Sequence, residues 1–302
     1  MRIAFAGTPE SAIAPLAALL ASHHFVEFVV TRPDAPTGRG RVMTPSPVAS
    51  FAAEHDIRVI KTSQLSDYAQ EFSQLDAVIV VAFGGMVPKE LLNTPSHGWI
   101  NLHFSLLPTW RGAAPVQYAI LSGDEHSGVT AFRIDEGLDT GPVLGQVSTA
   151  VDSFETAGEL LERLTEYGTT LMLQVLDGLE AGKIFAVPQS AQDASHAPKI
   201  AKDDARIVWD HPALAVARRI RAVTPTPGAW TMCNEERIKI SPVRLRTDVT
   251  DLAPGQVTER AGAVLVGTGT HAVELTMVQR PGKTFVEAGT WVSSTPDGLQ
   301  FS

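Results

Sequence analysis

The sequence predicts an α/β protein whose first domain contains a mostly parallel sheet and whose second, smaller domain is a β-barrel. In the first part of the chain, apolar strand-like runs alternate with segments of helical spacing. This order favours a parallel sheet with right-handed crossovers. After residue 228, short strand-like runs recur about every ten residues, a spacing typical of a small barrel. A polar stretch without periodicity predicts a linker at residues 188–204, between domains at 1–187 and 205–302.

The first domain is predicted to begin with a buried strand and a capped helix. Residues 2–6 form the strand, Thr8 caps the helix that follows, and Pro9 occupies its first position. The same alternation predicts the remaining elements of this domain. Helices are expected over residues 9–20, 48–55, 88–92, 113–121 and 153–181, and strands over residues 25–31, 58–61, 77–83, 98–103, 128–134 and 143–150.

The second domain is predicted to contain one basic helix followed by short strands. The helix covers residues 212–223 and carries Arg218, Arg219 and Arg221. Strands are expected over residues 229–233, 237–245, 256–259, 263–266, 272–278 and 290–292. The net charge is −11 over residues 1–204 and +2 over the remainder, which indicates that the second part meets something anionic.

Composition indicates a cytoplasmic globular protein. The longest apolar run, residues 77–83, is far shorter than the roughly 18 residues of a membrane helix. The first residues, MRIAFA, lack the apolar segment and cleavage site of a secretion signal. The single cysteine, Cys233, cannot form an internal disulfide and is expected to be a core or half-buried residue, and no Cys/His spacing fits a zinc site.

Residues 32–47 are expected to form a long loop at the carboxyl end of a strand. The segment contains four prolines, two glycines and three arginines. Open α/β sheets bind ligands at this end of their strands, so the loop is either a ligand contact or a solvated connection.

The strongest candidate site is a pair of polar residues at the end of a predicted strand. Asn101 and His103 are two positions apart, so both side chains should point to one side. A carboxamide can stabilise a developing oxyanion, and an imidazole can exchange a proton near neutral pH. Asp139, in the glycine-flanked loop 135–142, could fold back and orient the imidazole. Without a nucleophilic Ser or Cys, this set suits direct acyl transfer to an external amine.

Other common motifs are absent from the sequence. The residues after the first strand do not match G-x-G-x-x-G, which disfavours a dinucleotide cofactor. The Gly-Lys pairs at residues 182–183 and 282–283 lack the spacing of a phosphate-binding loop. There is also no G-x-S-x-G and no H-E-x-x-H.

The run NLHFSLLPTWRGAAP at residues 101–115, followed by DEGLDTGP, resembles the folate-dependent formyltransferases. The resemblance extends over AGTPE at 6–10, the segment 32–48 and APKIAKDDARIVW at 197–209, and it is greatest to the branch acting on methionyl initiator tRNA. It implies catalytic roles for Asn101, His103 and Asp139. It also implies a Rossmann-like formyltransferase domain followed by an OB-like barrel.

The resemblance further implies 10-formyltetrahydrofolate as co-substrate, with no metal. The family's tetrahydrofolate-binding segment matches Ser105, Leu106, Leu107 and Pro108. Arg39 matches the arginine of a loop that enters the tRNA acceptor end, and Arg41 is a second candidate for tRNA contact. We expect methionyl initiator tRNA as partner, no membrane partner, and a monomer.

Two alternatives stay open at this point. One is a formyltransferase whose acceptor is a small-molecule amine, either a sugar nucleotide or a purine precursor. The residues after 204 and the GRGRVMTPSP loop count against it. The other is a non-catalytic nucleic-acid binder, which would not need Asn101, His103 and Asp139 together.

Overall fold

The computed structural model describes residues 1–38, 40–294 and 298–302, so the predicted tRNA contact Arg39 lies outside the described residues. The chain divides into two compact units. The first comprises Met1–Pro115, His126–Thr149 and Leu161–His196, and the second comprises Val116–Glu125, Ala150–Leu160 and Ala197–Ser302. Two short segments that precede residue 161 therefore belong to the second unit. The predicted limits of domains and linker stay a prediction.

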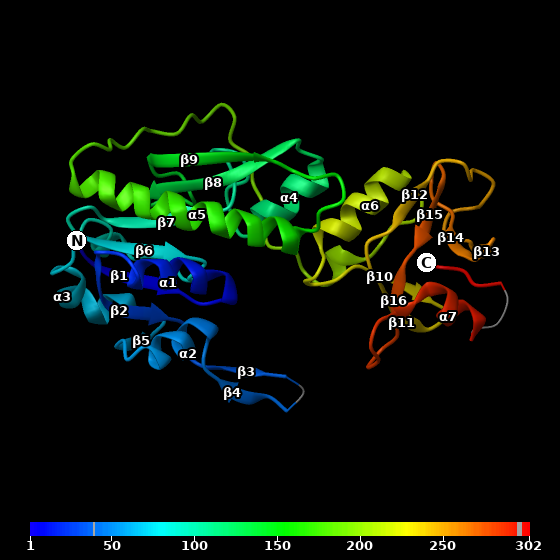
Figure 1. Ribbon diagram of the computed structural model, residues 1–302, viewed down its shortest axis with the longest axis horizontal. Helices are drawn as coiled ribbons and strands as arrows, with labels where there is room; N and C mark the ends of the chain where they lie inside the picture. The colour runs from blue at the N-terminus through cyan, green and yellow to red at the C-terminus, as the bar shows by residue number, and fades with distance from the viewer. Residues whose placement is uncertain (39, 295–297) are drawn as a thin grey trace. The chain divides into compact units, whose positions relative to one another are not determined.

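A seven-stranded sheet organises the first unit, with strand order β5-β2-β1-β6-β7-β8-β9 (Figure 1). Its strands are β1 (Arg2–Gly7), β2 (Phe25–Thr31), β5 (Val59–Lys61), β6 (Ala77–Val81), β7 (Trp99–His103), β8 (His126–Arg133) and β9 (Val143–Ala150). The five strands from β5 to β7 pair in parallel, and β8 runs antiparallel to β7. Every residue of β6 is buried, as expected for a central parallel strand covered on both faces. The mostly parallel sheet predicted from the sequence is confirmed.

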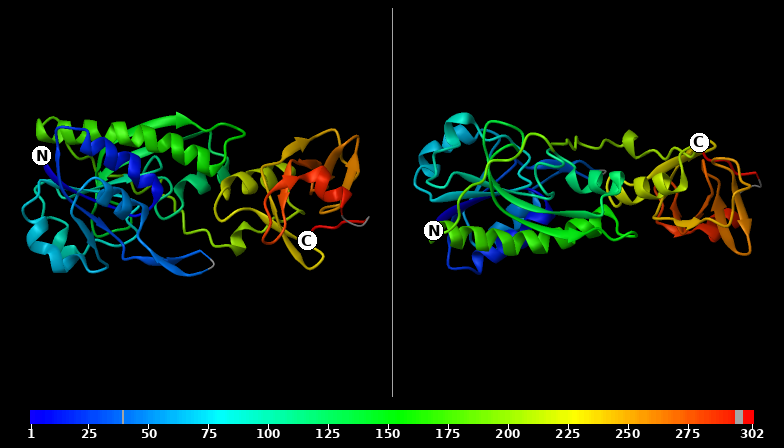
Figure 2. Two further views of the ribbon diagram at one scale, coloured as in Figure 1. Left: turned by 60° about the horizontal axis from the view of Figure 1, so that its bottom comes forward. Right: turned by 90° about the horizontal axis from the view of Figure 1, so that it is seen from above.

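Helices and helical turns cover both faces of this sheet. They are α1 (Ile13–Leu20), α2 (Pro47–Glu54), α3 (Ala69–Phe72) and α5 (Ala157–Glu180), with 3-10 turns η1 (Glu10–Ala12), η2 (Leu65–Tyr68) and η3 (Lys89–Leu91). Helix α4 (Pro115–Ser122) belongs, from Val116 on, to the second unit. Helix α5 packs over β7 and β8, where a Cβ on Gly168 would meet Val129 at 3.1 Å and Leu102 at 3.7 Å. Figure 2 shows α5, in green, on the opposite face from the turns η2 and α3. Residues 65–72, predicted as neither helix nor strand, thus close the second face.

Thr8 does not cap the first helix, so that prediction is wrong. Turn η1 begins after Pro9, and α1 begins at Ile13 without a side-chain cap. The Thr8 hydroxyl instead donates to the carbonyl of Phe83 at 2.8 Å. This bond joins the segments that follow the neighbouring strands β1 and β6, a partner that local sequence does not reveal.

The predicted loop 32–47 contains a β-hairpin, which corrects the sequence-based expectation. Strands β3 (Ala35–Thr37) and β4 (Val42–Thr44) pair antiparallel, and the hydroxyls of Thr37 and Thr44 lie 2.6 Å apart. Gly38 and Arg41 both have positive φ, +65° and +49°, which permits the tight reversal between the strands.

The second unit combines helix α6 (Ala213–Ala222) with two antiparallel sheets. One has the order β10-β11-β16-β17 and the other β12-β15-β14-β13. The strands are β10 (Trp230–Cys233), β11 (Glu236–Ile240), β12 (Arg244–Arg246), β13 (Val257–Arg260), β14 (Ala263–Val266), β15 (Ala272–Leu275), β16 (Met277–Gln279) and β17 (Val286–Glu287). Antiparallel strands after one helix agree with the predicted order. Closure of these strands into an OB-like barrel stays a prediction.

Three strand predictions in this unit need correction. The predicted strands 237–245 and 272–278 are each divided in two, because the chain passes from one sheet to the other. At this crossing the hydroxyls of Ser241 and Thr276 lie 2.7 Å apart, and Thr276 donates to the carbonyl of Pro242. Residues 290–292 lie in a helix, α7 (Ala288–Ser293), rather than a strand, and Trp291 is buried there.

Stacked aromatic rings form part of the core of the second unit. Phe301 stacks between Trp209 and Trp291, with ring centroids 5.5 and 5.7 Å apart. Cys233 is buried in the same cluster, as predicted. Within the residues that the structure describes, no helix is long and apolar enough to cross a bilayer.

The packing of Phe72 in the first unit can be tested by substitution. Phe72 is fully buried between Phe28 and Trp99, with centroids at 5.7 and 4.8 Å. Replacing Phe72 with Ala should lower the free energy of unfolding of this unit by about 3–5 kcal/mol, because buried aromatic area and packing are lost. Phe185→Ala, at a position 80% exposed, should change it by less than about 0.5 kcal/mol. Urea unfolding curves measure both, and equal effects would contradict this packing.

Candidate active site

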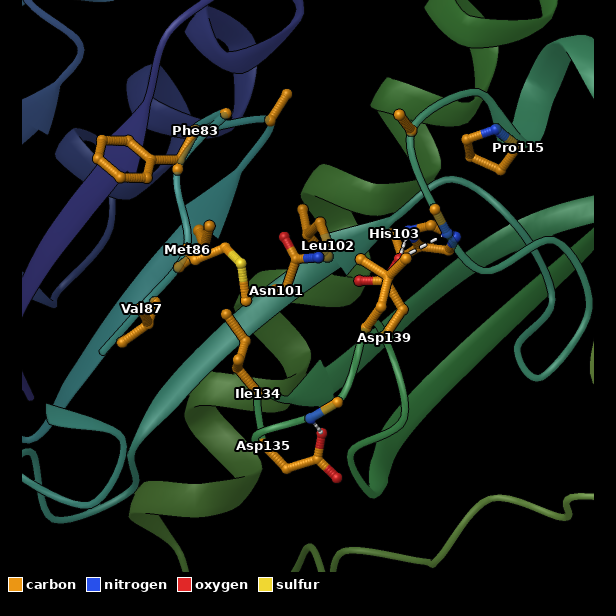
Figure 3. A pocket seen from close by; sticks show the side chains of 18 of the residues that line it. Phe83, Met86, Val87, Asn101, Leu102, His103, Pro115, Ile134, Asp135 and Asp139 are labelled. Carbon is orange, nitrogen blue, oxygen red and sulfur yellow. Dashed lines mark hydrogen bonds and ion pairs between the residues drawn. The ribbon is translucent and has the colours of Figure 1, made fainter. Parts of the chain in front are cut away.

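Strand β7 places two polar side chains at its carboxyl end, as predicted. Asn101 and His103 alternate with Ile100 and Leu102, so they share one face of the sheet. Both line a cavity of about 440 Å³, and Figure 3 shows them beside each other on the strand. Among the described residues, none hydrogen-bonds to the Asn101 carboxamide. Its N–H groups are therefore available to a ligand.

Asp139 folds back toward this pair, from the loop that follows β8. Its Oδ2 lies 3.6 Å from Nδ1 of His103 and accepts a 2.8 Å hydrogen bond from the backbone N–H of Gly112. Asp139 has φ +54°, in the left-handed region that non-glycine residues rarely occupy. Such a conformation persists where surrounding contacts impose it, and at functional sites it orients a side chain.

The loop containing Asp139 has its own internal bonds. Asp135 Oδ1 accepts from the hydroxyl of Thr140 at 2.6 Å and from the N–H of Gly137 at 3.0 Å. A Cβ on Gly141 would lie 1.8 Å from the carbonyl oxygen of Arg133, so only glycine fits at that position. The predicted glycine-flanked loop 135–142 is thus closely seated against the end of β8.

His103 is buried, with both ring nitrogens directed at oxygen atoms. Its Nε2 donates to the carbonyl of Trp110 at 2.8 Å, which leaves Nδ1 facing Asp139. Burial lowers the pKa of His103, whereas the charge of Asp139 and the Trp110 carbonyl act to raise it. The two acceptors would stabilise an imidazolium formed during a reaction.

The cavity combines an apolar wall with these polar groups. Its size falls within the range of small-molecule sites. Among its lining residues the apolar ones include Phe83, Met86, Val87, Ile134 and Leu138. Met86 and Leu138 are 83% and 61% exposed, so they stand at the accessible side of the cavity. Gly84 and Gly85 also line it, which agrees with the close backbone approach expected of glycine.

The predicted folate segment, residues 105–108, directly follows Phe104, which lines the cavity, and uses its polar groups internally. Ser105 donates to the carbonyl of Thr109, and its own carbonyl accepts from Thr130. Leu107 donates to the Thr130 hydroxyl and accepts from Gln146. None of the four predicted residues is among the described residues that line the cavity. Their role in folate binding stays a prediction.

Arg41, predicted to contact tRNA, and the arginines of the predicted basic helix lie in different surroundings. Arg41 is exposed in the turn of the β3–β4 hairpin. On α6, Arg221 donates to the carbonyl of Glu155 at 2.8 Å, and Arg219 donates to the carbonyl of Asp204. Arg218 lies against Gly123, where a Cβ would be 2.1 Å from its guanidinium carbon. The three α6 arginines therefore contact their own unit.

Sequence reasoning did not select Gly112, whose N–H holds the Asp139 carboxylate. Its signal is the run RGAAP within residues 101–115, where a glycine precedes helix α4. No local pattern links it to a residue 27 positions further on. Ile134, which also lines the cavity, was likewise not selected, because no local pattern links the end of β8 to this site.

Metal-ligating side chains occur together at one place in the described part of the chain. His23, His24 and Asp177 have ligand-type atoms within 4.8 Å of one another. These atoms pair internally, since His24 Nε2 lies 3.1 Å from Asp177 and His23 Nε2 lies 2.9 Å from Glu180. None of these residues lines the cavity described above. The expectation that no metal takes part stays a prediction.

Family profiles match both parts of the chain. One described as "Formyl transferase" covers residues 1–176, and one described as "Formyl transferase, C-terminal domain" covers residues 199–296. Both profiles describe formyl transferases, so the protein is a one-carbon group-transfer enzyme. The chain belongs to the formyltransferase family.

Similar proteins refine this assignment. The chain is 52% identical over 296 residues to the methionyl-tRNA formyltransferase of Arthrobacter sp. (strain FB24), covering 96% of each. It is 49% identical to the methionyl-tRNA formyltransferase of Streptomyces coelicolor, again over 96% of both chains. Within the family, its relatives at this level are thus methionyl-tRNA formyltransferases.

Solved structures share the fold at lower identity. An N-formyltransferase from Helicobacter canadensis, described with folinic acid and dTDP-3-aminofucose, has a TM-score of 0.71 at 20% identity, covering 92% of this chain and 98% of its own. HypX from Aquifex aeolicus, described with tetrahydrofolic acid, has a TM-score of 0.69 at 18% identity, covering 97% of this chain and 47% of its own. These likenesses support the α/β fold.

The His103–Asp139 pair can be tested by titration. In Asp139→Asn the pKa of His103 should fall further, because the neutral amide no longer stabilises the imidazolium while burial still opposes it. NMR of the His103 ring protons across pH measures this. Asp135→Asn is the matched control, since Asp135 lines the same cavity but bonds to Gly137 and Thr140. An unchanged or raised pKa in Asp139→Asn would show that the two groups do not interact.

Proposed function

We propose that this protein transfers the formyl group of 10-formyltetrahydrofolate to the α-amine of methionyl initiator tRNA. The observation that carries the proposal is the 52% identity, along nearly the whole chain, to a methionyl-tRNA formyltransferase. The cavity at the end of β7 adds the chemical groups that such a transfer needs. The product, formylmethionyl-tRNA, would serve translation initiation.

In the proposed reaction the amine nitrogen attacks the formyl carbon. The formyl oxygen gains negative charge, and the bond from its carbon to N10 of the folate then breaks as the new amide forms. Asn101 donates a hydrogen bond to the oxyanion, and protonated His103, held by Asp139, adds positive charge beside it. The proton lost by the amine passes to the departing folate nitrogen. Positioning and electrostatics supply the catalysis, with no covalent enzyme intermediate.

The folate would occupy the apolar part of the cavity. Phe83, Met86 and Val87 offer a surface suited to a flat heteroaromatic ring, and Asn101 would lie near the formyl group. We also propose that residues Ser105 to Pro108 contribute to folate binding indirectly, by supporting Phe104 in the cavity lining. Asn101, His103 and Asp139 supply the oxyanion and acid–base groups of the proposed reaction, so the proposal includes no metal.

A small-molecule acceptor is the alternative. Structures of sugar N-formyltransferases share the fold at about one-fifth identity, for example 19% for one described as a sugar 3N-formyltransferase. The relatives at about 50% identity match nearly the whole chain and are named methionyl-tRNA formyltransferases, which supports methionyl-tRNA as acceptor.

We also propose the domain roles that the sequence suggested. Residues 1–187 would form the catalytic domain, residues 188–204 a linker, and residues 205–302 an OB-like domain that binds tRNA. The profile limits at residues 176 and 199 support a boundary in this region. A cytoplasmic monomer is the assembly and location that we expect.

The direct test supplies purified protein with 10-formyltetrahydrofolate and methionyl initiator tRNA. Formylmethionine should appear on initiator tRNA and in far smaller amount on charged elongator tRNA, with no formylation of a dTDP-amino sugar. Formylation of the sugar alone would favour the alternative acceptor. The readout is the formylated amino acid released by hydrolysis.

His103 provides the catalytic variant. Replacing His103 with Ala should lower kcat about 100-fold or more, because the group that stabilises charge and exchanges a proton is removed. His55→Ala is the matched control, since His55 is exposed and its ring contacts the carbonyl of its own helix. Near-normal turnover of His103→Ala would refute the assigned role.

Arg41 provides the tRNA-binding variant. If its guanidinium contacts one phosphate, Arg41→Ala should weaken tRNA binding and reduce the slope of log K against log salt concentration by about 0.7 to 0.9. Arg41→Lys keeps the charge and should keep the slope. Filter binding over a range of KCl concentrations measures both, and an unchanged slope in Arg41→Ala would remove Arg41 from the interface.

A further inference from the structure

Gln189 lies in the segment that follows α5 and links two catalytic loops through its side-chain amide. Its Nε2 donates to the carbonyls of Asp139 and Gly141, at 2.8 and 2.7 Å. Its Oε1 accepts from Nε and Nη2 of Arg111, at 3.2 and 2.7 Å. A guanidinium only donates, so the amide oxygen must face Arg111 and the amide nitrogen must face the two carbonyls. All these residues belong to the first unit.

The two loops that Gln189 joins carry both partners of the His103 ring. Trp110, next to Arg111, supplies the carbonyl that accepts from Nε2. Asp139 supplies the carboxylate that faces Nδ1, and this carboxylate also accepts from Gly112, on the other side of Arg111. The position of the imidazole between its acceptors therefore depends on how the two loops are held together.

Ser195, in the same segment as Gln189, also binds the Trp110–Gly112 loop. The hydroxyl of Ser195 accepts from the N–H of Trp110 at 2.9 Å, and its carbonyl accepts from the N–H of Arg111 at 2.9 Å. The N–H of Ser195 donates to the carbonyl of Pro108 at 3.3 Å. Gln189 differs from Ser195 because it alone reaches across to the Asp139 loop.

Asp139 needs such support because of its backbone conformation. Its φ of +54° is unfavourable for a residue with a Cβ, and the amide of Gln189 binds carbonyls on both sides of Thr140. The bonds of Asp135, to the Gly137 N–H and the Thr140 hydroxyl, are made within the loop itself, whereas Gln189 binds the loop from another segment. Gln189 thus secures the half of the loop that points the carboxylate at His103.

We propose that Gln189 is a positioning residue for the formyl transfer, holding the Asp139 loop and the Trp110–Gly112 segment in the register that orients His103. It touches no substrate and acts through these two loops. This inference rests on the proposed function, and its test has a readout that does not require the reaction.

The test compares Gln189→Leu, which keeps side-chain bulk and removes every hydrogen bond, with Gln192→Leu. Gln192 is exposed, three positions further on in the same segment. Gln189→Leu should lower kcat about 10- to 100-fold, because small misplacements of catalytic groups have effects of that order. The KM for each substrate should stay within about threefold, since no ligand contact is removed. Gln192→Leu should match the unaltered protein.

The second readout is the titration of His103 by NMR. In Gln189→Leu its pKa should fall, because the two oxygen acceptors that favour the imidazolium are no longer held beside the ring. Asp135 and Glu136, the other carboxylates lining the cavity, are unchanged in this variant. An unaltered pKa together with an unaltered kcat would overturn the proposal. If the unaltered protein formylates no acceptor but the pKa still falls, the proposed function fails while the positioning role stands.

Gln189→Glu separates the two halves of the amide. A glutamate can still accept from Arg111, but it cannot donate to the carbonyls of Asp139 and Gly141. We expect a loss of kcat comparable to that of Gln189→Leu. Full activity in Gln189→Glu would overturn the proposal, because the donated bonds to the Asp139 loop carry it. Thermal unfolding of each variant identifies any loss of activity that comes from a loss of folded protein, and a loss fully explained in that way also counts against the proposal.

Discussion

The return of the Asp139 loop onto the end of β7 is the constraint on which the site depends. Without it, Asn101 and His103 are two side chains on a strand, open to solvent on one side. The 2.8 Å bond from Gly112 to Asp139 brings a carboxylate to 3.6 Å from the imidazole and closes one side of the cavity. The loop reaches this place only because Gly141 fits against the carbonyl of Arg133. A missing Cβ at one position therefore makes the whole arrangement possible.

Two opposing effects act on the imidazole in this arrangement. Removal from water favours the neutral ring, whereas the acceptors at both nitrogens favour the cation. An imidazole whose two nitrogens already face oxygen atoms can carry positive charge during a reaction with little rearrangement. Groups fixed in this way stabilise a developing charge better than water does, because their dipoles need not reorient as the charge forms.

Periodicity and local residue chemistry were sufficient to predict much of the fold and the Asn101–His103 pair. Side chains two positions apart on a strand share a face, and β7 follows this rule. Predictions failed where partners are distant in sequence. The hydroxyl of Thr8 bonds 75 positions away, to Phe83, and nothing near Thr8 reveals it. Strand breaks at Ser241 and Thr276 likewise follow from the passage of the chain between two sheets, which β propensity alone does not indicate. Gln189 escaped notice for the same reason, since a polar stretch without periodicity predicts only a linker.

The composition of the second compact unit has a practical consequence for work with fragments. Segments Val116–Glu125 and Ala150–Leu160 belong to it, although the profile that covers them ends at residue 176. Within this unit Arg221 bonds to the carbonyl of Glu155, and the N–H of Gly158 donates to the carbonyl of Thr224. Expression of residues 197–302 by themselves would remove the hydrogen-bond partners of Arg221 and of the Thr224 carbonyl. A truncation designed from the profile limits would thus divide one compact unit between two fragments, and intact protein is the sound starting material for biochemistry.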